Sequence, residues 1–108
     1  MSRYVFSTVV ARGAKLLDKA RPGWWKRIDT PTLEMSSCEH CILGQEYGND
    51  PSLPLGSTGY STGGLALGVR GEEGKYGFAD FQERWRSLRS AWVGLIKSRY
   101  RDAAKGMK

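Results

Sequence analysis

The clearest pattern of hydrophobic positions lies in the C-terminal third of the chain. Six apolar side chains follow one another at i, i+4, i+7, i+11, i+14 and i+15, a spacing that places them on one face of a helix; they are Phe81, Trp85, Leu88, Trp92, Leu95 and Ile96. Asp80 with Glu83 three residues later is typical of a capped helix start. We therefore predict an amphipathic helix that runs to about Ala103, with Arg86, Lys97 and Arg101 on its opposite side.

Shorter helices are predicted upstream. Apolar residues within 5–20 recur at helical spacing until Pro22-Gly23 ends the pattern. Asp29-Thr30-Pro31 has the residue types of a further helix start. Ser36-Ser37 offers an N-cap and Gly48 a stop, which predicts a helix over residues 37–47. Its apolar side is expected to hold Cys38, Cys41 and Ile42.

The hydrophobic pattern disappears between residues 48 and 77. Nine glycines and two prolines interrupt this segment, which favours loops with at most one helical turn around Leu65 and Leu67. A connection this long without regular structure is usually functional or mobile. The chain is thus predicted to form a mainly α-helical fold with a long Gly-rich loop region. We expect the C-terminal helix and residues 8–20 to enclose the Cys38–Tyr47 helix between them, with the four tryptophans in or beside the core.

Length and composition place limits on this fold. A chain of 108 residues is expected to form one domain, residues 1–108, with flexible ends at 1–4 and 104–108. No run of 18 apolar residues occurs, so no contact with a membrane is expected. Ser7, Thr8 and Arg12 interrupt the apolar start in a way that argues against a signal peptide. Two cysteines without an export signal favour reduced thiols in a cytoplasm.

Charge is distributed unevenly along the chain. Residues 1–27 carry seven basic and one acidic side chain, residues 28–80 two basic and eight acidic, and residues 81–108 eight basic and two acidic. The basic ends either pack around the acidic middle, form solvated helix faces, or attract nucleic acid or an acidic protein. If nucleic acid is bound, Arg86, Lys97 and Arg101 are the candidate contacts, although no known nucleic-acid-binding motif is present.

The sequence Cys38-Glu39-His40-Cys41 has three interpretations. A cysteine in the first turn of a helix, with a partner three residues away, could support redox chemistry, but Glu39 would oppose a thiolate. Cys38, His40 and Cys41 are candidate zinc ligands, but a closed structural site needs a fourth ligand and the chain has no second ligand pair. The third interpretation is that the cysteines are small apolar residues of the core. We expect neither a metal nor another cofactor.

Known catalytic signatures are not evident elsewhere. Gly63-Gly64 and Gly68 lack the following Lys-Ser/Thr of a phosphate-binding loop. The acidic residues of the middle are scattered, with no paired-carboxylate motif, and nothing near His40 suggests a catalytic dyad. The prediction is that the protein is not an enzyme.

One longer pattern resembles a known group of proteins. Its spacing, P-G-W followed by I, L-x-M, C-x-x-C-I-L-G-Q-x-Y-G and then Y-G-F, is similar to that of small proteins encoded by phages of actinobacteria. The matching residues are Leu16, Leu17, Asp18, Pro22, Gly23, Trp24, Ile28, Asp29, Leu33, Met35, Cys38, Cys41, Ile42, Leu43, Gly44, Gln45, Tyr47, Gly48 and Tyr76-Gly77-Phe78. The resemblance implies a phage origin and a host bacterial cytoplasm, without supplying a mechanism.

These observations predict a non-catalytic phage accessory protein that binds a host or phage protein. The Gly-rich segment 48–77 and the basic helix faces are the expected contact surfaces. Nucleic-acid binding through the basic N- and C-terminal segments is the first alternative, and redox or zinc chemistry at Cys38 and Cys41 is the second.

Overall fold

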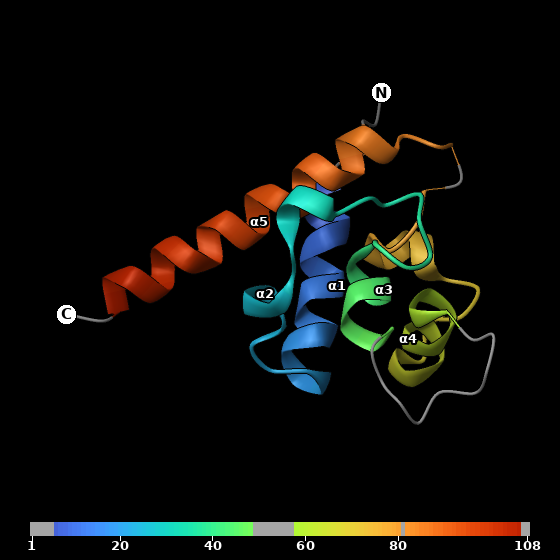
Figure 1. The fold of residues 1–108 in the computed structure, drawn as a ribbon, viewed down its shortest axis with the longest axis horizontal. Helices are drawn as coiled ribbons and strands as arrows, with labels where there is room; N and C mark the ends of the chain where they lie inside the picture. The colour runs from blue at the N-terminus through green and yellow to red at the C-terminus, as the bar shows by residue number, and fades with distance from the viewer. Residues whose placement is uncertain (1–5, 49–57, 81, 107–108) are drawn as a thin grey trace.

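A computed structural model describes residues 6–48, 58–80 and 82–106. These residues form helices joined by turns, and no strand occurs among them. The α-helices are α1 (Phe6–Ala20), α2 (Trp24–Arg27), α3 (Ile42–Tyr47), α4 (Gly59–Leu67) and α5 (Trp85–Gly106), and two 3-10 helices are η1 (Thr30–Thr32) and η2 (Glu73–Tyr76). The predicted mainly α-helical fold is confirmed (Figure 1).

The core forms where α5 crosses α1 (Figure 1). The apolar stripe predicted for α5 turns inward as expected, since Leu88, Trp92 and Ile96 are buried. Trp92 stacks on Phe78 with ring centroids 5.7 Å apart and meets Trp24 edge to face at 5.6 Å. Its indole N–H donates to the carbonyl of Gly77 at 2.6 Å, so the polar atom of this buried ring is satisfied.

The predicted helix over 37–47 is shorter than expected. Helix α3 begins at Ile42, and Cys41, whose backbone is extended, is its N-cap. The Ser37 hydroxyl accepts the backbone N–H groups of Glu39 and His40, and so closes a turn rather than starting the helix. Cys38 therefore lies outside the helix and is exposed, which corrects its expected place on the apolar face.

The Gly-rich segment is also more ordered than predicted. It contains the nine-residue helix α4 and the 3-10 helix η2, while residues 49–57 lie outside the described part of the chain. The Thr58 hydroxyl accepts the Ser61 N–H at 3.1 Å and caps α4. A Cβ added to Gly59 would lie 2.5 Å from the Gly44 carbonyl oxygen. The glycines that weaken this helix locally thus allow it to pack closely on α3.

Two other expectations about helix arrangement are wrong. Helices α1 and α5 pack directly on each other, and α3 packs chiefly on α4 instead of between them. The predicted helix start at Asp29-Thr30-Pro31 is only the three-residue 3-10 helix η1.

Helix α5 begins later and ends later than predicted. The Asp80 carboxylate accepts the Arg84 backbone N–H at 2.7 Å, but Glu83 has a φ of 58° and the helix starts at Trp85. It continues to Gly106, so residues 104–106, expected to be flexible, are helical. The other expected flexible residues, 1–4 and 107–108, and the predicted apolar contact at Phe81 lie outside the described residues.

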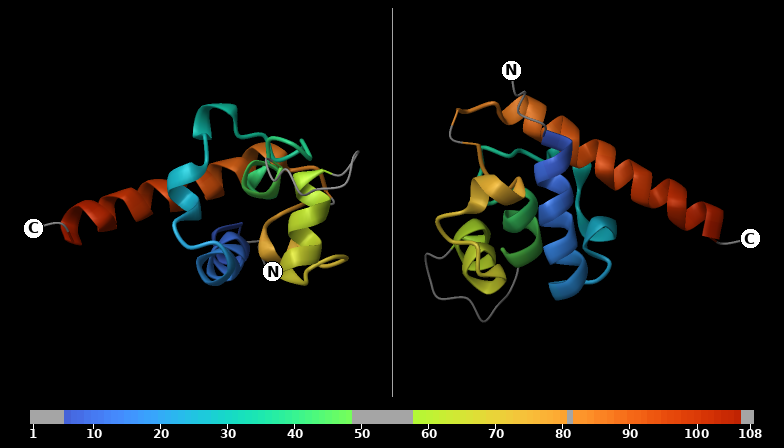
Figure 2. Two further views of the ribbon diagram at one scale, coloured as in Figure 1. Left: turned by 60° about the horizontal axis from the view of Figure 1, so that its bottom comes forward. Right: turned by 180° about the vertical axis from the view of Figure 1, so that it is seen from behind.

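The C-terminal part of α5 projects away from the other helices, on the side opposite α4 (Figures 1 and 2). Ile96 is the last fully buried side chain of this helix. We call residues 97–106 the α5 arm. Asp18 anchors its base, because Arg99 donates two hydrogen bonds to that carboxylate at 2.7 and 2.8 Å.

Candidate functional site

The two cysteines of the Cys38–Cys41 motif have different surroundings. Cys41 is buried, and its sulfur accepts the Gly44 N–H at 3.3 Å as the cap of α3. Burial raises the pKa of the Cys41 thiol to about 11, so the sulfur is protonated at neutral pH and is a poor nucleophile or metal ligand. Cys38 is exposed, and both cysteines are unpaired. The interpretation of two packed thiols thus holds for Cys41 only.

His40 lies in the turn before α3 and is exposed. Its Nδ1 lies 3.1 Å from the Ser37 hydroxyl oxygen, which also accepts two backbone N–H groups and therefore has a capping role. Across residues 6–48, 58–80 and 82–106, no three His, Cys, Asp or Glu side chains are grouped closely enough to hold a metal ion.

Gln45 and Glu46 explain the polar residues that follow the cysteines. The Gln45 amide donates to the carbonyls of Asp29 and His40 and accepts the Asp29 N–H, so it links the turns on either side. The Glu46 carboxylate is 3% exposed and accepts hydrogen bonds from Arg27, the shortest 2.6 Å, with the Arg21 Nε 3.5 Å away. The basic N-terminal segment therefore packs in part around the acidic middle. These side chains hold the fold together.

The burial of the phage-like motif follows the same logic. Most of its long apolar residues are in the core: Leu17, Trp24, Ile28, Leu33, Met35, Ile42, Leu43, Tyr47 and Phe78. A Cβ added to Gly44 would lie 2.5 Å from the carbonyl oxygen of Cys38, so close packing accounts for the glycine in α3. The motif describes how the core is packed.

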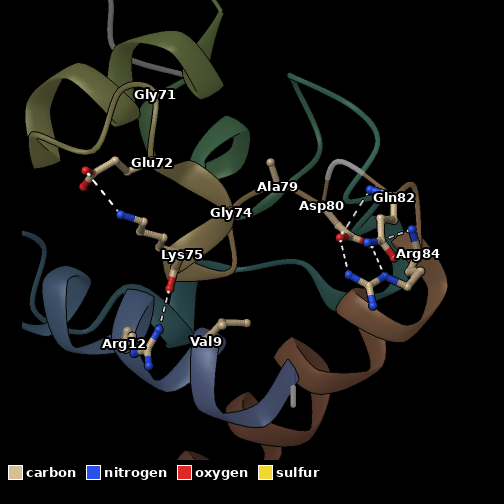
Figure 3. A pocket seen from close by; sticks show the side chains of 10 residues that line it. All are labelled: Val9, Arg12, Gly71, Glu72, Gly74, Lys75, Ala79, Asp80, Gln82 and Arg84. Carbon is tan, nitrogen blue, oxygen red and sulfur yellow. Dashed lines mark hydrogen bonds and ion pairs between the residues drawn. The ribbon is translucent and has the colours of Figure 1, made fainter. Parts of the chain in front are cut away.

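A hollow of about 410 Å³ separates the first half of α1 from residues 71–84 (Figure 3). Its charged side chains are engaged with neighbouring groups in its wall. Arg12 donates to the Lys75 carbonyl at 3.4 Å, the Lys75 ammonium lies 3.6 Å from the Glu72 carboxylate, and Arg84 binds Asp80 at 2.8 Å. The Arg84 hydrogen bonds lower the pKa of Asp80. This hollow presents paired charges, which suits a structural contact better than ion binding.

The three basic residues predicted as contacts are all exposed, but they do not form one site. Lys97 and Arg101 line the same shallow hollow on α5, together with Gly94 and Tyr100. Arg86 lies 11 residues before Lys97, which is about 16 Å along the helix, and lines a different hollow with Trp85 and Arg89. Only Lys97 and Arg101 are brought together.

Several surface residues were missed by sequence reasoning. Trp25 contacts Tyr100, Gly94 lies on the polar side of α5, and Leu65 is exposed on α4. Gly94 carried a usable signal, because a glycine in the middle of a strong helix pattern needs a reason. The contact between Trp25 and Tyr100 left no sequence signal, because 75 residues separate them.

No protein-family model matches the chain, and neither a curated protein nor a solved structure is significantly similar to it. Among the described helices, none combines the length and apolar character required to cross a membrane.

Proposed function

We propose that this protein is a non-catalytic phage accessory protein that acts by binding a host or phage protein in the host cytoplasm. The phage origin comes from the resemblance of the motif. The non-catalytic role is supported by the structural use of the reactive groups: Cys41 caps α3, and Glu46 is ion-paired beneath the surface.

The outer face of α4 is the observation that carries protein binding. This helix contains no charged residue in Gly59–Leu67. Its inner side packs on α3 through Gly59 and Gly63. Leu65 is 67% exposed on the outer side, beside the exposed Ala66. Single exposed leucines are common, but depletion of charge around an exposed apolar side chain is typical of the centre of a protein interface.

The test compares two exposed helix positions. Leu65→Glu adds a carboxylate to the outer face of α4, and Ala11→Glu adds one to the exposed side of α1. The tagged wild-type protein and both variants are incubated with lysate from an actinobacterial host, with and without phage infection, and bound proteins are quantified. We expect a protein that the wild type and Ala11→Glu retain and Leu65→Glu loses. Identical recovery by all three, or no specific recovery by the wild type, would contradict the proposal.

A further inference from the structure

Two segments that are both basic in sequence meet at the base of the α5 arm. Trp25 of α2 and Tyr100 of α5 pack edge to face, with ring centroids 4.9 Å apart and an interplanar angle of 88°. The Lys26 ammonium lies 5.2 Å from the centroid of the Trp25 ring. Tyr100 remains 50% exposed and shares a hollow with Lys97 and Arg101. Cations and aromatic rings are therefore interleaved on one surface.

The positive charge of this surface is not neutralised by its own helix. Lys97, Arg101 and Lys105 are exposed at intervals of four residues, which places them on one side about 6 Å apart along the axis. The one acidic residue of α5, Asp102, follows Arg99 at i+3, and Arg99 is bound to Asp18. Within the part of the chain that the structure describes, no ion pair holds Lys97, Arg101 or Lys105.

Gly94 is unexplained by the fold itself. It is exposed in the middle of α5, and a Cβ added there would meet nothing within 4 Å. Glycine weakens a helix relative to almost any other residue, so internal packing gives no reason for it. Its missing side chain opens the hollow of about 530 Å³ that Lys97, Tyr100 and Arg101 line. This is an arrangement that lets another backbone approach the helix closely.

We propose that this surface, formed by Lys26, Gly94, Lys97, Tyr100, Arg101 and Lys105, binds single-stranded nucleic acid. The cations contact successive phosphates, the sugar-phosphate chain passes over Gly94, and an unpaired base stacks on the exposed ring of Tyr100. A duplex keeps its base faces stacked inside, and an acidic protein gives the aromatic ring no base to stack on. The proposal goes beyond protein binding by α4, since it rests on a different surface at the other end of the molecule.

The test uses the full chain and a fluorescein-labelled oligothymidylate of about 15 nucleotides, followed by fluorescence anisotropy across a salt series. For the double variant Lys97→Gln/Arg101→Gln we expect roughly tenfold weaker binding or more at low salt, and a salt slope reduced by about 1.4, or 0.7 for each phosphate contact. Arg86→Gln is the matched control, an exposed arginine of the same helix outside the hollow, and should leave both quantities unchanged. Tyr100→Leu should weaken binding at least about fivefold.

Gly94→Gln separates binding from stability. Glutamine is the better helix former and meets no neighbour, so the melting temperature should rise, while its side chain fills the hollow and weakens binding. Absence of oligothymidylate binding at low salt would overturn the proposal, as would an equal loss with Arg86→Gln. So would a duplex or a polyglutamate peptide that binds as tightly as the oligonucleotide. Leu65→Glu should bind the oligonucleotide normally, so protein binding by α4 can fail or succeed independently.

Discussion

The segment from Ile28 to Gly48 and the α5 arm use their polar side chains in opposite ways. The first holds both cysteines, the histidine and a buried carboxylate, yet Cys41, Gln45 and Glu46 spend their polar atoms on caps, turns and ion pairs inside the molecule. The arm has plainer chemistry, but Lys97 and Arg101 remain exposed without an ion-pair partner among the described residues. Reactive residue types therefore indicate function less well than unsatisfied ones do.

The largest expected contrast is in thiol reactivity. At pH 7 a thiol with a pKa near 11 is ionised to only about one part in ten thousand, and Cys41 is also shielded by burial. Exposed Cys38 should react with iodoacetamide in the native protein, and Cys41 only after unfolding. Mass spectrometry of timed reactions, with Cys38→Ser as control, checks this. Rapid labelling of both thiols in the folded protein would show that α3 opens easily, and would break the contrast.

Two helical glycines should respond with opposite signs. Gly44→Ala forces a methyl group against the backbone of Cys38 and Glu39 and should cost about 2 to 3 kcal/mol of stability. Gly94→Ala places the same group in open space and should gain about 1 kcal/mol. Urea unfolding of both variants measures the difference. A loss at Gly94 would mean that internal packing, and not an outside partner, explains that residue.

The anchor of the arm should contribute a smaller and pH-dependent effect. Hydrogen bonds from Arg99, and then from Trp24, hold the pKa of Asp18 below its ordinary value. A carboxylate with a lowered folded pKa stabilises the fold above its unfolded pKa near 3.9, and this contribution is lost as the pH falls through the folded pKa. Asp18→Asn keeps an acceptor for Trp24 but should lose at most about 1 kcal/mol at pH 7.

Thermal melts between pH 7 and pH 2.5 test this linkage. The gap between wild type and Asp18→Asn should be constant at neutral pH and close below about pH 4. A gap that stays open at pH 2.5 would show that the charge of Asp18 is not its source.

Sequence reasoning succeeded where one helix face carries a dense apolar stripe, as with Leu88, Trp92 and Ile96. It failed at α4, because the glycines that argue against a helix locally are needed for contact with α3. It also placed Cys38 wrongly, since a serine hydroxyl before it caps a turn as well as a helix.

The candidate surface was predicted only in part for a related reason. The exposure of Lys97 and Arg101 follows from helical spacing alone. Their grouping with Tyr100, and with Lys26 through Trp25, depends on a tertiary contact between α2 and α5. Local patterns contain no information on such a contact.

The most direct test of the contrast between the two regions is one binding measurement on two double variants. Oligothymidylate anisotropy at low salt is recorded for Cys38→Ser/His40→Gln and for Lys97→Gln/Arg101→Gln. The account predicts that the first variant binds within about twofold of wild type and that the second loses roughly tenfold or more. Weakened binding by the first variant with normal binding by the second would contradict it.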